Sequence, residues 1–166
     1  MKNMKQLLLL AISLFGSSIA FSAEDELKLF VKLSPAGSFT AKSDKVKGDL
    51  IKDGATFKAE KLTVLISSFK TGMSLRDEHF CKHLKCEANP KAILTDFSAT
   101  NGMGKGTLEV AGVKKPIEVA YVEKGTQLVG TLKFKASEFG LPPAKYLGVG
   151  VNDEVTGEVT VTFKNK

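Results

Sequence analysis

Alternation of apolar and polar residues with a period of two is the feature that most constrains how this chain folds. It is clearest in residues 27–33, 128–134 and 155–163, where every second position is apolar or glycine and most residues between them are polar. Successive side chains of a β-strand point to opposite faces of the sheet, so the pattern indicates strands with one buried face. We therefore expect an all-β chain.

Turn signals divide the chain at short intervals. They include Asp53-Gly54, Asn101-Gly102, Gly112 to Lys115 and Lys124-Gly125. These breaks predict about eight strands of similar length, which form an antiparallel barrel or a sandwich. Glycines within the apolar faces, at Gly48, Gly130 and Gly157, suit sharp strand curvature or a close approach by a ligand, and they favour the barrel.

Three segments depart from simple alternation. Across residues 55–69 the apolar positions change parity, which predicts a long strand with a bulge near Lys61. Strands at 108–110 and 117–121, joined across 112–116, are expected to form a hairpin. Residues 74–84 are rich in charge and in helix formers, so we expect a short helix or an ordered loop there.

The N-terminus has the layout of a secretory signal peptide. Lys2 and Lys5 precede an apolar run at 7–15, and small residues follow it. The run is too short to cross a bilayer as a helix. We assign residues 1–22 to the signal, with cleavage after Ala20 or Ser22, and residues 23–166 to one secreted domain, which is periplasmic if the source is bacterial.

Charge argues against a nucleic-acid partner. Removing Lys2 and Lys5 with the signal leaves 22 basic and 18 acidic side chains, a net charge of +4. The lysines are scattered along the strands and form no concentrated basic stripe with stacking aromatics. This balance permits a transient contact with an anionic membrane surface, and it leaves a monomer and a dimer equally open.

All cysteines and histidines of the chain lie in one segment, His79-x-Cys81-x-His83-x-x-Cys86. Export and an even cysteine count favour a disulfide between Cys81 and Cys86. Residues five apart do not share a face of a regular helix, so the bond requires the helix to end or distort around 83–85. The bond would hold a lid over one end of the barrel.

Two other interpretations of this segment remain open. The two thiolates and two imidazoles are the ligand types of a zinc or copper centre, although the spacing matches no common zinc layout. The second interpretation is that the cysteines are free thiols or take part in thiol–disulfide chemistry. Redox enzymes, however, usually have two residues between their cysteines, and here there are four. Neither a catalytic cysteine–histidine dyad nor any other catalytic constellation is recognisable, so we do not expect an enzyme.

An ordered series of short motifs resembles the YceI family of bacterial secreted proteins. Thr71-Gly-x-x-x-Arg-Asp-x-His79 follows a long strand and precedes Asn89-Pro-x-Ala-Ile93 and Phe97. Gly106-Thr-Leu108, Gly112 to Pro116, Ser137 to Gly140 and Val151 to Val155 complete the series. The resemblance extends from about Leu29 to Phe163, and only the cysteine pair departs from the family pattern.

The resemblance implies a lipocalin-like antiparallel barrel of eight strands, with one short helix as a lid, that binds polyisoprenoid or other long amphiphilic lipids and has no common catalytic activity. The only cofactor-like group that it implies is a bound isoprenoid or quinone-like lipid. An apolar wall for such a ligand would come from the alternating positions Val31, Phe39, Phe57, Leu62, Val64, Ile66, Ile93, Phe97, Leu108, Val119, Tyr121, Leu132 and Phe134. Periodicity alone favours packing of these residues together as a dry core, and it is the resemblance that favours a cavity.

Arg76 is the remaining candidate for ligand binding. It could contact a lipid head group or a quinone oxygen at the barrel mouth, or it could form a structural ion pair or cap that holds the turn at Thr71. The leading hypothesis is a periplasmic carrier or buffer of an isoprenoid-like amphiphile. The alternatives are a redox or metal-handling protein that uses the cysteine and histidine cluster, and a ligand-free stress-response barrel.

Overall fold

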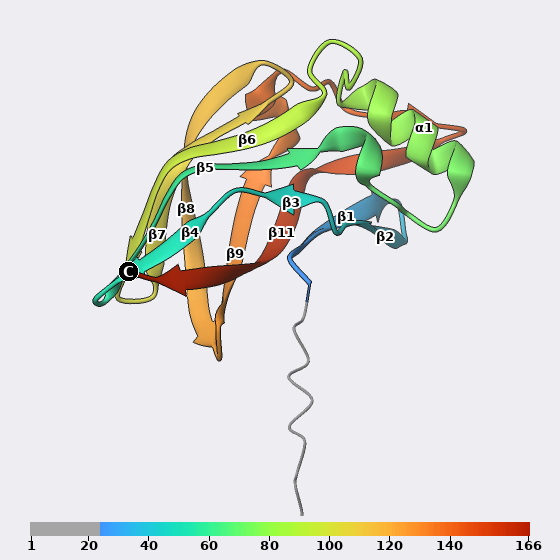
Figure 1. Cartoon of the computed structure of the whole chain (residues 1–166). Helices are drawn as coiled ribbons and strands as arrows, with labels where there is room; N and C mark the ends of the chain where they lie inside the picture. The colour runs from blue at the N-terminus through green and yellow to red at the C-terminus, as the bar shows by residue number, and fades with distance from the viewer. Residues whose placement is uncertain (1–23) are drawn as a thin grey trace, which may run out of the picture.

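A computed structural model of the protein describes residues 24–166 (Figure 1). The predicted signal peptide, residues 1–22, and both predicted cleavage points lie outside the described residues. The described strands are β1 (Glu26–Ser34), β2 (Ser38–Ser43), β3 (Val46–Lys47), β4 (Leu50–Asp53), β5 (Thr56–Leu65), β6 (Lys91–Thr100), β7 (Met103–Val110), β8 (Val113–Lys124), β9 (Gln127–Lys135), β10 (Lys145–Tyr146) and β11 (Val149–Asn165). The helices are α1 (Ser74–His83) and the short 3₁₀ turns η1 (Ile66–Ser68) and η2 (Ala136–Phe139).

The strands close into a barrel. Seven of them follow one another in the order β11-β4-β5-β6-β7-β8-β9, and β9 pairs again with β11. The long β11 pairs with β9 along one edge, and with β1 and then β4 along the other. The predicted lipocalin-like barrel with one short helix is confirmed. The described chain contains more strands than the expected eight, because residues 38–53 break into three short strands with different neighbours, and β4 runs parallel to β11.

Tight two-residue turns join the strands on either side of β7. Asn101 and Gly102 both have positive φ, and so do Ala111 and Gly112, which is the geometry of hairpin turns that match strand twist. The expected hairpin is present, but its loop is shorter than predicted because 113–116 continue the strand. Pro116 is tolerated there because β9 pairs with β8 only from Ala120 onward.

A change of phase occurs in two adjacent strands. In β5, Ala59 and Leu62 are both buried, and Glu60 and Lys61 are exposed between them, which confirms the predicted irregularity near Lys61. The neighbouring β6 changes phase opposite this point, with a register shift between Thr95 and Ser98. Inward and outward positions therefore exchange parity halfway along both strands.

Gly48 and Gly130 lie where the barrel wall has no room for a side chain. Gly48 has a φ of 129°, and a Cβ there would overlap the carbonyl oxygen of Lys61. At Gly130 a Cβ would lie 2.8 Å from Val119 Cγ1. These glycines, predicted from their place in the apolar faces, permit close contact between parts of the protein itself.

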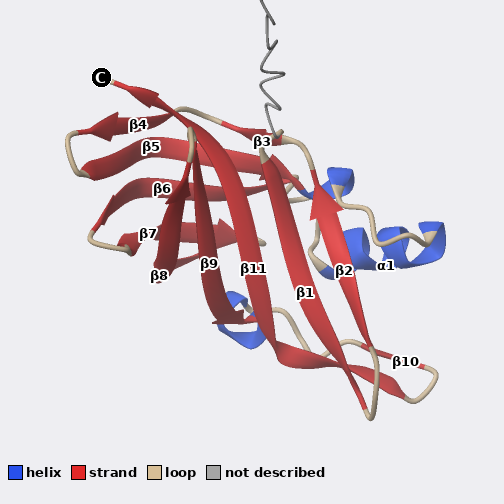
Figure 2. Cartoon of the chain, turned by 90° about the horizontal axis from the view of Figure 1, so that it is seen from below, coloured by secondary structure: helices blue, strands red, loops and turns tan. Residues whose placement is uncertain are grey.

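One end of the barrel is filled by aromatic side chains. Phe57 makes edge-to-face contacts with Tyr121 and Phe163, with ring centroids 5.4 and 5.0 Å apart. They belong to a buried cluster that includes Leu50, Phe97, Ala99, Leu128 and Val161. The C-terminus lies at this end, and α1 lies across the opposite end (Figures 1 and 2).

Helix α1 begins directly after Met73, and no side chain caps its first turn. Asp77 lies in that turn and Lys82 in the last, each at the end where its charge complements the helix dipole. The helix packs on the barrel through Phe80, whose ring centroid is 5.4 Å from that of Phe69. No helix among residues 24–166 has the length and apolar character needed to cross a bilayer.

Candidate functional site: an apolar cavity under helix α1

The end of the barrel beneath α1 contains a cavity of about 860 Å³. Its walls come from inward positions of most barrel strands, from α1 and from the β10–β11 hairpin. The lining is apolar except for Thr63, Arg76, His79, Lys82, His83 and Lys145. A volume of this size lies within the range of about 300–1,000 Å³ that is typical of small-molecule sites.

Side-chain type along the barrel explains why one half is filled and the other hollow. At the C-terminal end, phenylalanine and tyrosine rings meet across the interior. Towards α1 the inward positions carry mainly leucine and valine, including Leu29, Val64 and Val155. Their side chains do not reach across an interior of this width. The inward residues therefore form a packed core at one end of the barrel and line an apolar cavity at the other.

Ten of the predicted ligand-binding residues lie in the cavity wall: Val31, Phe39, Leu62, Val64, Ile66, Arg76, Leu108, Val119, Leu132 and Phe134. The structure places the other four elsewhere. Phe57, Phe97 and Tyr121 belong to the cluster at the filled end. Ile93 is absent from the wall, which contains its neighbours Ala92 and Leu94 instead. The phase change in β6 explains this, because Ile93 and Phe97 share a parity but not a face.

Apart from Arg76, sequence reasoning missed the part of the wall that α1 contributes. Met73, Arg76, Phe80 and His83 line the cavity, and they recur at intervals of three or four residues. This spacing places side chains on one face of a helix, and it is the signal that could have identified them. A search for strand alternation does not detect it.

The mouth of the cavity carries exposed apolar side chains. Met73 and Leu75 beside the start of α1 are 53% and 52% exposed, and Leu147 at the tip of the β10–β11 hairpin is 86% exposed. All three also line the cavity. Leu147 has a φ of 47°, a conformation in hairpin turns that usually favours glycine, asparagine or aspartate. An apolar surface therefore surrounds the opening.

Arg76 points along the cavity wall, and its neighbour Asp77 holds the preceding turn. The Arg76 guanidinium stacks on the Phe39 ring at 4.9 Å and donates a hydrogen bond to Met73 Sδ at 2.9 Å. Asp77 Oδ1 accepts hydrogen bonds from the backbone N–H of Thr71 at 2.8 Å and from its hydroxyl at 2.6 Å. The hydroxyl bond is the main cause of a lowered pKa of the Asp77 carboxyl. The structural role at the Thr71 turn thus belongs to Asp77.

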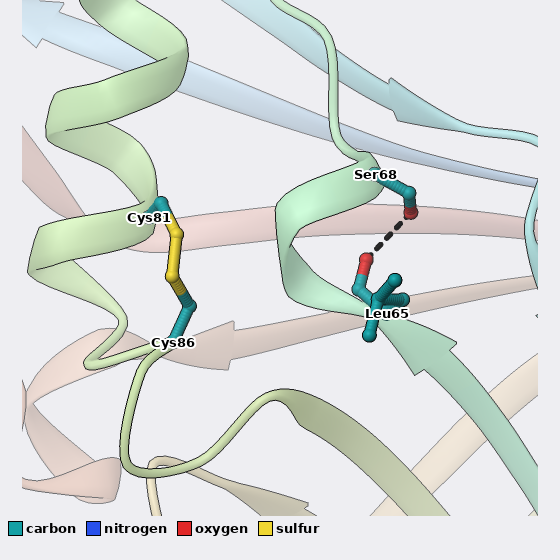
Figure 3. Close-up of a disulfide and its surroundings, with 4 residues drawn as sticks. All are labelled: Leu65, Ser68, Cys81 and Cys86. Atoms are coloured by element: carbon teal, nitrogen blue, oxygen red, sulfur yellow. Dashed lines mark hydrogen bonds between the residues drawn. A yellow bond between two sulfur atoms is a disulfide. The ribbon is translucent and has the colours of Figure 1, made fainter.

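The disulfide predicted between Cys81 and Cys86 is present (Figure 3). Its Cα atoms are 5.2 Å apart. The helix ends at His83, and Lys85 adopts a φ of 54°, which turns the chain so that the Cys86 N–H reaches the Cys81 carbonyl at 3.0 Å. Helix termination before Cys86 is what this bond requires. The disulfide therefore ties the end of α1 to the loop that leads into β6.

The disulfide also removes the chemical basis of a thiolate metal site. Both sulfurs are bonded to each other, and residues 24–166 contain no group of three or more histidine, cysteine, aspartate or glutamate side chains placed to hold a metal ion. His83 is half-buried against the cavity, and burial lowers the pKa of its imidazole. At neutral pH it therefore contributes an uncharged ring to the wall.

Reduction of this disulfide is expected to destabilise the protein modestly. The cysteines are only five positions apart, so restricting the unfolded chain contributes about 2 kcal/mol, and the melting temperature should fall by roughly 5–10 °C. Thermal unfolding followed by circular dichroism, with and without dithiothreitol, measures this. The double variant Cys81→Ser/Cys86→Ser is the control and should not respond to the reductant. An unchanged melting temperature of the reduced wild-type protein would contradict the expected contribution.

Comparisons with known proteins agree with this architecture. A model of the YceI-like domain matches residues 15–164. No curated protein sequence matches the chain. BcnA of Burkholderia cenocepacia is a structural neighbour with a TM-score of 0.61 and 17% identity, over 81% of this chain and 94% of that one.

Two further solved structures share the fold. A polyisoprenoid-binding domain from Saccharophagus degradans, implicated in plant cell wall breakdown, has a TM-score of 0.61 and 14% identity over 82% of this chain and 91% of its own. The Campylobacter jejuni YceI protein has a TM-score of 0.55 and 23% identity, over 72% of this chain and 82% of that one. At these identities the likeness concerns the barrel itself.

Proposed function

Because the chain belongs to the YceI-like family, we propose that it is a non-catalytic lipid-binding protein that holds an isoprenoid-like or other long-chain amphiphile in its barrel. The observation that carries this proposal is the cavity of about 860 Å³, whose wall is apolar except at the α1 end. Its size and composition suit a flexible hydrocarbon chain. The polyisoprenoid-binding domain from Saccharophagus degradans, which has the same fold, adds support.

Hydrophobic burial is sufficient for binding in such a cavity. Each methylene transferred from water into an apolar site contributes about 0.8 kcal/mol. Ten buried carbons would supply about 8 kcal/mol before the entropic cost of ordering the chain is subtracted. No precise polar site is needed for the tail, so one protein could accept chains of related length and branching.

The proposed location is outside the cytoplasm, and in a bacterium the periplasm. The signal-like residues 1–22 support export. The Cys81–Cys86 bond supports it independently, because disulfides persist in oxidising compartments. A carrier there would take up ligand through the mouth beneath α1. The exposed Met73, Leu75 and Leu147 suit a transient contact with a membrane during that exchange.

Extraction of the purified protein tests the proposed function. Gentle purification followed by organic extraction and mass spectrometry should yield an amphiphile in a ratio of about one per chain, as expected for a single enclosed site. Delipidated protein should then bind added isoprenoids. A periplasmic protein of similar size, purified from the same cells, controls for lipid that adheres nonspecifically. Repeated preparations without stoichiometric lipid, together with no binding of added isoprenoids, would refute the proposal.

A further inference from the structure

The ionisable side chains that line the cavity are all basic. Within the described chain, Arg76, His79, Lys82, His83 and Lys145 border it, and no aspartate or glutamate does. Four of the five come from α1 and the fifth from β10, so they are concentrated at the mouth. Elsewhere on the barrel, lysines and carboxylates form pairs such as Lys28–Glu26 and Lys52–Glu123. The charge at the mouth is therefore unbalanced.

Arg76 is held in a fixed orientation at this position. It is the only arginine in a chain with 24 basic residues. Its guanidinium carbon lies over the Phe39 ring, 4.9 Å from the centroid, and Met73, three residues earlier, accepts one N–H at its Sδ atom. A guanidinium group presents several donors in one plane and can bind two oxygens of a phosphate or carboxylate at once. Lysine cannot reproduce this geometry.

The cations of the mouth have no direct ion-pair partner among the described residues. Among residues 24–166, Arg76, Lys82 and Lys145 form no ion pair with an aspartate or glutamate. Asp77 is held by the Thr71 turn and by Lys70, whose Nζ lies 3.8 Å from its Oδ2, and attraction to Arg76 is the smallest of the causes that lower the Asp77 pKa. Glu78 and Glu87 border a separate surface hollow beside the disulfide, which Lys82 also lines, and neither carboxylate lines the cavity.

We propose that the ligand of this barrel is an anionic amphiphile, whose phosphate or carboxylate head is bound at the mouth by Arg76, with Lys82 and Lys145 contributing positive potential. The inference rests on the proposed function and narrows its ligand class. The apolar tail would occupy the cavity beyond α1, and the head would stay at the mouth, where it remains hydrated on one side. A neutral quinone or alcohol with the same tail would lack this interaction.

Matched ligands with one tail and two heads test the inference. Farnesyl phosphate and farnesol are titrated separately against delipidated protein loaded with N-phenyl-1-naphthylamine, an uncharged fluorescent probe that each displaces. Hydrogen bonds to a charged phosphate are stronger than those to a neutral hydroxyl, so wild-type protein should bind farnesyl phosphate at least roughly tenfold more tightly than farnesol. Arg76→Gln should remove most of that difference and change farnesol affinity by less than about twofold.

Control variants separate the proposed contact from general effects of charge and folding. Lys115→Gln removes an exposed cation of β8 that does not line the cavity, and it should leave both affinities unchanged. The double variant Lys82→Gln/Lys145→Gln should weaken farnesyl phosphate binding with farnesol affinity retained. Circular dichroism shows whether Arg76→Gln folds. If it does not fold, the double variant still tests the inference.

The outcomes distinguish this inference from the proposed function. If wild-type protein binds neither ligand, the proposed function itself fails. If wild-type protein binds both ligands equally, or if Arg76→Gln still prefers farnesyl phosphate over farnesol, the proposed lipid-binding function stands and the proposed contact between Arg76 and an anionic head is refuted. Inorganic phosphate that binds as tightly as farnesyl phosphate would assign the cations to a soluble anion. Arg76→Gln could instead leave the binding of both farnesyl ligands unchanged and reduce only co-sedimentation with phosphatidylglycerol vesicles, relative to phosphatidylcholine vesicles. That result would assign the cations to contact with a bilayer surface. Either result overturns the inference.

Discussion

Replacing Ala92 by tryptophan should nearly abolish amphiphile binding while the barrel remains folded. Ala92 lies on β6, lines the cavity, and packs against buried residues on both sides of it, among them Phe69 and Val110. An indole ring there would occupy space meant for the ligand. Displacement of about four methylenes, at about 0.8 kcal/mol each, corresponds to roughly hundredfold weaker binding. Displacement of the fluorescent probe by farnesyl phosphate measures the loss.

Ala120→Trp is the matched control for that experiment. Ala120 lies on β8 next to buried Val119, but its own side chain is exposed on the outer surface of the barrel. The same substitution there should leave binding unchanged. Wild-type affinity in Ala92→Trp, with a native circular dichroism spectrum, would show that the ligand does not occupy the cavity.

Replacing Phe57 by alanine should have the largest effect on stability. Phe57 is 2% exposed and contacts both Tyr121 and Phe163 at the filled end of the barrel, and Lys52 Nζ lies 5.3 Å from its ring centroid. Removal of a buried aromatic ring leaves a cavity and costs about 3–5 kcal/mol. Urea denaturation followed by circular dichroism should show this loss in the free energy of unfolding.

Phe30→Ala provides the comparison. Phe30 lies on β1 and is 41% exposed, so its truncation should cost less than about 1 kcal/mol. Because Phe57 does not line the cavity, Phe57→Ala protein that is still folded should bind ligand with unchanged affinity. A loss of binding without a loss of stability would mean that the filled end belongs to the ligand site, contrary to the structure.

Much of the fold could be predicted because the period of a strand is short and local. Val64 and Leu132 could be assigned to the interior from their immediate neighbours in the sequence, and both line the cavity. The change of parity near Lys61 was visible in the same way, since apolar side chains mark both halves of β5. Termination of α1 before Cys86 followed from the geometry that a disulfide requires.

Predictions failed where a partner strand, or the other end of the barrel, decided the result. Ile93 and Phe97 have equal parity, and only the register shift between β6 and β7 separates their faces. Phe57 and Tyr121 point inward as expected, but they pack in the buried cluster at the C-terminal end of the barrel and do not line the cavity. Position along the barrel axis depends on how strands are staggered, and alternation contains no information about it.

By itself, the sequence determined that the chain is all-β with a short helix or ordered loop beside its cysteine pair, because alternation and turns are local constraints. The choice of a barrel over a sandwich came from the glycines in the apolar faces and from the family resemblance. Only the tertiary structure decided that one end is packed with rings and the other is hollow, because that depends on which distant side chains meet across the interior. It also brought Arg76 and Lys145, which lie far apart in the sequence, to one cavity mouth. Closure of the barrel places these two residues together, and their local sequence contains no information about that proximity.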